Sequence, residues 1–183
     1  MDVNAKKILN EISRCIETTD FSNHNQFVNY IAAHDKILLT GAGRVGLVMR
    51  SFAMRLMHLG FNAHYLGEVT VPHFQKGDLL LIGSGSGATP SILATAQIAF
   101  SKELHIALVT SSTESPIGKL TNLQLLLSAP SKNEGLTHPK SIQPMTTLFE
   151  QTLQIYLDSV VLDLMEVMKV TSSEMWGRHN AIE

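Results

Sequence analysis

Several features that define common classes of protein are scarce or missing in this sequence. It contains a single cysteine, Cys15, which excludes an internal disulfide bond. It has no uninterrupted run of about 18 apolar residues, the length that a membrane-spanning helix needs. Its first residues mix charged with apolar side chains and lack the apolar core of a signal peptide. These absences predict a cytoplasmic protein.

Charge is also scarce and nearly balanced. The 14 basic and 16 acidic residues give a formal net charge of -2. Nucleic-acid-binding proteins carry an excess of positive charge, so we expect neither nucleic acid nor a membrane as a partner. Apolar residues make up 44% and charged residues 16%, a balance that excludes extensive disorder. A chain of 183 residues can bury its own core, and we predict one domain over residues 1–183.

Short apolar runs alternate with segments of helical periodicity along the chain. Apolar residues nearly fill four of the five runs, as is typical of strands buried on both faces of a parallel sheet. The exception, 61–66, is expected near an edge. The runs cover 36–40, 61–66, 78–82, 104–110 and 123–128, and the helical segments cover 3–18, 22–33, 45–59, 90–100 and 146–169. This pattern predicts an α/β fold, a doubly wound five-stranded parallel sheet flanked by helices.

The last helical segment predicts self-association. It is the longest and is followed by a polar tail, so that long helix and tail together cover 146–183. Its apolar residues form more than one stripe, and a small sheet can cover only one of them. We therefore expect a dimer or a tetramer in which another subunit covers the rest.

The first predicted strand ends in the pattern G-x-G-x-x-G at 41–46. This pattern is found in dinucleotide-binding folds, but there an acidic residue follows after about 20 positions. The nearest candidate here, Glu68, comes later. The alternative is that the glycines close a tight strand-to-helix turn. Both interpretations stay open at this point.

A more specific loop follows the third predicted strand. Hydroxyl side chains alternate with glycines just before a helix that begins at Pro90, with Thr89 as its N-cap. Glycines let backbone N–H groups approach an anion, and hydroxyls donate to its oxygens. A flexible Ser/Gly turn is the alternative. We predict a monophosphate site, with these candidate residues: Ser84, Gly85, Ser86, Gly87 and Thr89.

The loop, with its Ser-Gly-Ser-Gly-x-Thr pattern, resembles the sugar isomerase (SIS) family of phosphosugar-binding domains. Further segments resemble the 6-phospho-3-hexuloisomerase branch of that family. They are Gly-Ala-Gly-Arg at 41–44, Ser-Phe-Ala-Met-Arg-Leu-Met-His-Leu-Gly-Phe at 51–61, Ile-Gln-Pro-Met at 142–145, Leu-Phe-Glu-Gln at 148–151, and the terminal Arg-His-Asn-Ala-Ile-Glu at 178–183. The family usually has a serine where this chain has Val45.

The resemblance implies a flavodoxin-like fold and an isomerase of the ribulose monophosphate pathway, which interconverts 3-hexulose 6-phosphate and fructose 6-phosphate through a cis-enediol. Such proton transfer requires no cofactor and no metal. Two alternatives stay open: a sugar-phosphate sensor without catalysis, and an isomerase of another phosphosugar such as arabinose 5-phosphate. A basic DNA-binding segment, which regulators of this family usually carry, is missing from the sequence.

The candidate catalytic residues are Glu150 and His179. Glu150 lies in an apolar stretch near the start of the long helix, and the resemblance assigns the corresponding glutamate the role of the base. The alternative is an acidic residue that complements the helix dipole. His179 is the acid/base candidate for ring opening, in the same or a neighbouring subunit, unless the tail is disordered. Gly43 and Arg44 complete the expected substrate-binding set, although Arg44 could instead make a surface salt bridge.

Overall fold

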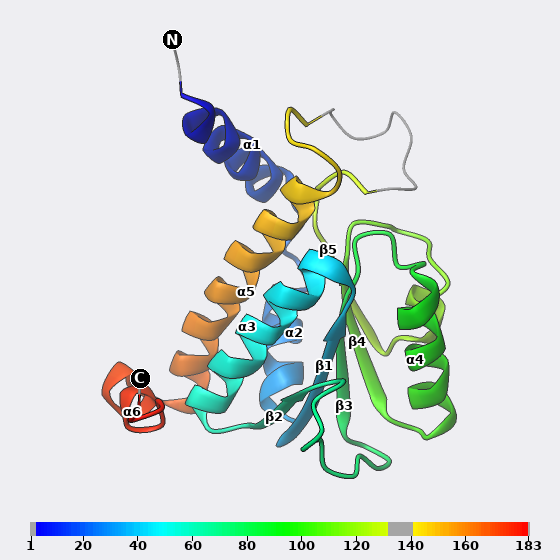
Figure 1. Ribbon diagram of the computed structural model, residues 1–183, viewed down its shortest axis with the longest axis vertical. Helices are drawn as coiled ribbons and strands as arrows, with labels where there is room; N and C mark the ends of the chain where they lie inside the picture. The colour runs from blue at the N-terminus through cyan, green and yellow to red at the C-terminus, as the bar shows by residue number, and fades with distance from the viewer. Residues whose placement is uncertain (1–2, 132–140, 183) are drawn as a thin grey trace.

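The computed structural model describes residues 3–131 and 141–182, in which helices and strands alternate (Figure 1). The helices are α1 (Asn4–Thr18), α2 (His24–Ala32), α3 (Gly43–Leu59), α4 (Pro90–Ser101), α5 (Thr147–Met168) and α6 (Ser172–Gly177), with a 3-10 turn η1 at Gly118–Leu120. The strands are β1 (Lys36–Gly41), β2 (Asn62–Tyr65), β3 (Leu79–Gly83), β4 (His105–Thr110) and β5 (Leu123–Leu126). Every predicted element is present, and its ends differ from the prediction by at most two residues.

The strands form one parallel sheet in the order β2-β1-β3-β4-β5. The predicted fold class is therefore confirmed, and the order is that of flavodoxin-like doubly wound sheets. After β1, the chain adds β2 on one side of it and then adds β3, β4 and β5 in turn on the other side. Ligands of such sheets bind beyond the carboxyl ends of the strands where the order reverses, here between β1 and β3. The apolar run at 61–66, which the sequence analysis placed near an edge, forms β2, and β2 is an edge strand.

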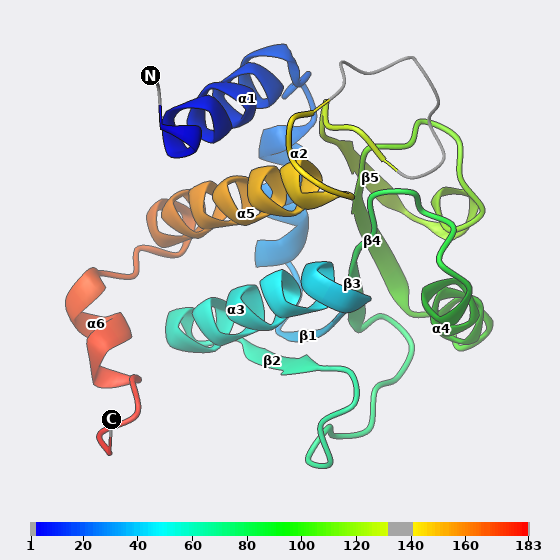
Figure 2. The same cartoon turned by 45° about the horizontal axis from the view of Figure 1, so that its top comes forward.

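Helices cover both faces of the sheet, so successive strand residues enter two separate apolar layers. Leu39, Leu81 and Val109 lie in the layer formed with α1, α2, α3 and α5. Leu80 and Leu108, from the opposite face, pack with α4. Figure 2 shows the unequal cover, with α4 on one side and the other main helices on the opposite side. Water reaches neither face of the central strands β1, β3 and β4, and these strands are apolar almost throughout.

Helix α6, which the sequence analysis did not predict, packs against the far end of α3. Thr171 and Glu174 form a capping box at its start. Arg178, just after the helix, donates from Nη1 to the carbonyl oxygen of His58 at 2.9 Å. Within the part of the chain that the structure describes, no helix combines the length and apolar character needed to cross a membrane.

Candidate active site

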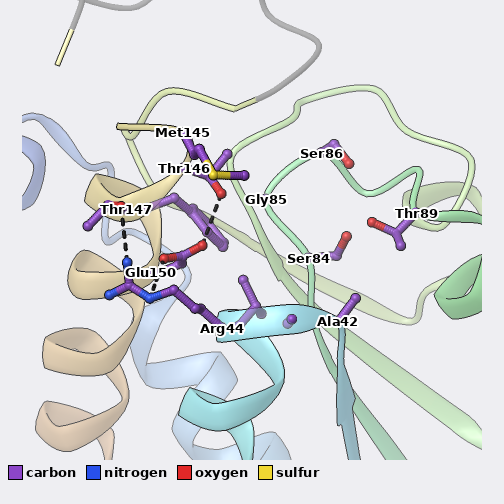
Figure 3. Close-up of a pocket in the computed structure, with 14 residues that line it drawn as sticks. Ala42, Arg44, Ser84, Gly85, Ser86, Thr89, Met145, Thr146, Thr147 and Glu150 are labelled. Atoms are coloured by element: carbon purple, nitrogen blue, oxygen red, sulfur yellow. Dashed lines mark hydrogen bonds and ion pairs between the residues drawn. The ribbon is translucent and has the colours of Figure 1, made fainter. Parts of the chain in front are cut away.

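A cavity of about 450 Å³ opens at the carboxyl ends of β1 and β3 and reaches the first turn of α5 (Figure 3). This volume falls within the range of small-molecule sites, about 300–1,000 Å³. Its lining brings together segments that are far apart in the sequence: residues 42–45, 83–86 and 145–147, with Thr89, Phe149 and Glu150. The cavity lies at the reversal of strand order, where such folds bind their ligands.

The predicted phosphate loop supplies one wall of this cavity. Ser84 is only 4% exposed, and its Oγ has no hydrogen-bond partner among the described residues. Ser86 and Thr89 also line the cavity. Thr89 is the N-cap of α4 with Pro90 at the first helical position, as predicted, but its side chain does not cap the helix. These hydroxyls and the positive end of the helix dipole suit an anion.

Hydrogen bonds from the neighbouring strand end fix this loop from behind. The carbonyl oxygen of Gly85 accepts from Thr110 Oγ1 at 3.0 Å and from both the amide (3.1 Å) and the hydroxyl (3.0 Å) of Ser111. Gly87 has a φ of 56°, and a Cβ there would lie 2.2 Å from the hydroxyl oxygen of Ser115. Gly87 therefore shapes the turn but does not line the cavity, unlike Gly85. The hydroxyl oxygen of Ser115 in turn accepts from Gly118 N at 3.0 Å, at the start of the 3-10 turn.

Glu150 supplies the opposite wall, in the first turn of α5. The residue is 8% exposed. Its Oε1 accepts from Thr146 Oγ1 at 3.0 Å, and its Oε2 lies 3.2 Å from Arg44 Nε. Figure 3 shows Glu150 across the cavity from Ser84. A carboxylate and a phosphate-sized group of hydroxyls thus face the same space, as proton transfer on a phosphorylated substrate requires.

Arg44 lines the cavity and contacts the carboxylate. Its Nη1 donates to Thr147 Oγ1 at 3.1 Å, and Thr147 donates in turn to the carbonyl oxygen of Pro144 at 2.7 Å. The sequence analysis gave a surface salt bridge as the alternative role of Arg44. Arg44 does form a salt bridge, but with Glu150 and inside the cavity. Gly43, at the start of α3, lines the same wall.

The sequence analysis missed Thr146 and Thr147. They place hydroxyls on both partners of the Arg44–Glu150 pair. The available signal was two threonines within one helical turn before the candidate base. At a helix start, however, such residues are normally interpreted as caps.

His179 lies elsewhere in the chain that the structure describes. It follows α6, beyond the far end of α5 from Glu150, and the 1.5 Å rise per residue puts that end on the order of 30 Å away. Its ring contacts His58 and Trp176, with centroid distances of 5.4 and 5.2 Å. The structure brings together all other candidate residues except Gly87, which lies behind the loop.

Two glycines of the first loop, Gly41 and Gly46, allow close packing. A Cβ on Gly46 would lie 2.7 Å from both the carbonyl oxygen of Gly41 and the hydroxyl of Tyr65. The carboxylate of Glu68 pairs with Arg50 of α3 and accepts a hydrogen bond from Tyr65 N, so it is engaged away from the first loop. This geometry favours the strand-to-helix turn over a dinucleotide site.

The fold and the cavity define an α/β domain in which a loop rich in hydroxyl groups faces a buried carboxylate. Residues 30–155 match the family model described as the SIS domain, and the chain belongs to this family.

Three relatives are informative. The chain is 42% identical over 179 residues to the 3-hexulose-6-phosphate isomerase of Bacillus subtilis, which covers 97% of this chain and 96% of the relative. It is 37% identical over 148 residues to the enzyme of the same name from Mycobacterium gastri, covering 81% of this chain and 74% of that protein. A solved structure from Methanococcus jannaschii, for which a function as 3-hexulose-6-phosphate isomerase has been inferred, is 32% identical with a TM-score of 0.82. That match covers 98% of this chain and 99% of the other.

Proposed function

We propose that this protein is an isomerase that interconverts 3-hexulose 6-phosphate and fructose 6-phosphate. One observation carries the proposal: the buried carboxylate of Glu150 faces the hydroxyl loop 84–89 across one cavity. The names of the relatives favour this activity over a sensor and over an isomerase of another sugar phosphate.

The reaction moves a carbonyl group between C2 and C3 of the sugar. Glu150 takes the proton from the carbon next to the carbonyl, and the C–H electron pair forms the C2=C3 double bond of a cis-enediolate. The π electron pair of the carbonyl moves to its oxygen, and Arg44, which lies against Glu150, stabilises the negative charge there. The hydroxyl proton of the neighbouring oxygen then transfers to this oxyanion. Glu150 returns its proton to the former carbonyl carbon, which leaves the carbonyl group on the neighbouring carbon. No electron leaves the substrate, so we propose neither a redox cofactor nor a metal.

The phosphate binds at the loop in this proposal. Ser84, Ser86 and Thr89 donate hydroxyls, while Gly85 and Gly43 allow close approach of the ligand. Binding of the phosphate at a fixed distance from Glu150 aligns the carbonyl carbons with the base, and such alignment accounts for much of the rate in proton-transfer enzymes.

We propose that His179 acts in the site of another subunit of a dimer or tetramer. Within its own chain it lies beyond the far end of α5 from Glu150. Exposed apolar side chains on α3 and α5, among them Leu47 and Leu162, provide a surface for such an assembly.

The experiment that tests this function couples consumption of 3-hexulose 6-phosphate to detection of fructose 6-phosphate. We expect turnover by the wild type. In Glu150→Gln, kcat should fall by about 10²–10⁴-fold, the usual contribution of a general base, with a smaller change in KM. Glu166→Gln is the matched control, because Glu166 is an exposed glutamate further along the same helix.

Two outcomes would contradict the proposal separately. An inactive wild type that still binds sugar phosphates would exclude the isomerase activity. A Glu150→Gln variant that keeps most of its turnover would show that another group is the base.

A further inference from the structure

The N-terminus of α5 departs from ordinary helix capping. Thr146 occupies the N-cap position, where a threonine normally accepts a hydrogen bond from a helix N–H. Here its side chain caps nothing and donates instead to Oε1 of Glu150, one turn further on, at 3.0 Å. The helix start gives up a stabilising bond, and the carboxylate gains a donor.

The preceding residue shows a second departure. Met145 has a φ of 57°, in the left-handed region that non-glycine residues rarely adopt. Its side chain is exposed and lines the cavity mouth. Strained backbone of this kind persists where the surrounding structure holds it and is concentrated at functional sites. The turn at Met145 leads directly into the position from which Thr146 reaches Glu150.

The two oxygens of Glu150 have different surroundings. Oε2 is buried, lies against Arg44 Nε at 3.2 Å, and makes no hydrogen bond to the described residues. Oε1 lies on the side of the carboxylate that faces Ser84 and Gly85 (Figure 3). A carboxylate oxygen has two lone-pair directions. The Thr146 hydroxyl occupies one direction at Oε1, which leaves the other for a substrate proton.

We propose that Thr146 is a positioning residue, whose hydrogen bond fixes Oε1 of Glu150 as the oxygen that accepts the substrate proton. This inference rests on the proposed function of Glu150 as the base. In the step, the substrate C–H bond breaks, an O–H bond forms at Oε1, and the electron pair stays on the sugar as the enediol double bond. Thr146 exchanges no proton, and Arg44 remains against Oε2 throughout.

A hydrogen bond donated to a carboxylate fixes the position of the oxygen that accepts it. Loss of the bond should therefore misplace the base relative to the substrate C–H bond and lower kcat, with less effect on substrate binding. A purely structural role would lower the amount of folded protein and would leave the kcat of the folded protein unchanged.

The test compares Thr146→Val, which keeps the shape but removes the donor, with Thr146→Ser, which restores it. In Thr146→Val we expect kcat to fall about tenfold or more, as for loss of a hydrogen bond to a charged group, with KM within about threefold. Thr146→Ser should stay close to the wild type in both kcat and KM.

Thr152→Val is the matched control. Thr152 is a buried threonine of the same helix, and its hydroxyl donates to the carbonyl oxygen of Leu148 at 2.8 Å, away from the cavity lining. Its removal should change the free energy of unfolding without lowering the kcat of the folded protein.

A second measurement is independent of turnover. At one fixed pH, the ¹³C signal of the Glu150 carboxyl group should change its chemical shift in Thr146→Val relative to the wild type, and it should stay in place in Thr152→Val. An unchanged signal in Thr146→Val would overturn the inference even in an active enzyme. A changed signal in a protein with no isomerase activity would support the contact and contradict only the proposed function.

Discussion

At the scale of single residues, Ser84 is the clearest example of a polar side chain that the contacts of the described fold do not explain. Its hydroxyl is buried, lines the cavity, and has no hydrogen-bond partner among the described residues. Buried polar groups are almost always paired, so an unpaired group at a cavity wall indicates a partner that binds there. Most other polar side chains of the loop region, such as Thr110 and Ser111, bond to the backbone.

We predict that Ser84→Ala separates binding from stability. The KM for the sugar phosphate should rise about tenfold or more, because a bond to a charged group is lost. The free energy of unfolding of the ligand-free protein should not fall, because the hydroxyl bonds to nothing in the described structure. Steady-state kinetics and denaturant unfolding measure the two effects. Ser101→Ala, at the far end of α4, is the control for a serine remote from the cavity. An unchanged KM would remove Ser84 from the site.

At the scale of elements, the contact between α3 and α6 is built around a buried histidine. His58 is 3% exposed. Burial lowers the pKa of His58, and the charges of Arg55 and His179 lower it further. Arg178 fixes the backbone at the same place by its bond to the His58 carbonyl. The site around His58 therefore favours a neutral imidazole.

This environment predicts acid sensitivity of the contact. Because the folded-state pKa of His58 lies below its unfolded value, the unfolded chain binds more protons once the pH falls below about 6.5. The stabilisation is complete above that pH and is lost as the pH falls toward the folded-state pKa. We expect the Tm of the wild type to drop between pH 7 and 5, and the drop should be smaller in His58→Gln. Thermal unfolding at several pH values measures this, and equal slopes for the two proteins would contradict it.

The sequence predicted the elements well and some contacts poorly. Apolar runs predicted the sheet because both faces of these strands are buried, and the glycines predicted the turns. Helix α6 was missed because the segment after the long helix is polar and short. The Thr171–Glu174 capping box at its start is nevertheless visible in the sequence. The role of Thr146 could not be predicted, because it depends on the side-chain rotamer and on the left-handed backbone at Met145.

At the scale of the whole molecule, the long helix remains only partly covered within one chain. Leu162 on α5 is 64% exposed and Leu47 on α3 is 65% exposed. The two helices pack against each other on the same face of the sheet. The prediction from the sequence that α5 has more apolar surface than one sheet covers agrees with this exposure.

We expect an assembly of at least two 20.1 kDa chains in solution. Leu162→Glu should weaken it, because a buried unpaired charge at an interface is unfavourable. Ile98→Glu is the control, since Ile98 is equally exposed but lies on α4, on the opposite side of the sheet. Light scattering after size exclusion gives the mass of each protein. A wild-type particle of a single chain at micromolar concentration would contradict this prediction.

The attachment of the loop 84–89 to the end of β4 has a consequence for selectivity. The carbonyl of Gly85 is held by three donors, and Gly87 is closed against Ser115, so the loop is preorganised before any ligand arrives. Little conformational entropy is then lost on binding, and the affinity depends on how well an anion matches a recess of fixed size. We therefore expect this rigid recess to discriminate by shape, and to prefer a tetrahedral phosphate ester to a planar carboxylate, although both are anions.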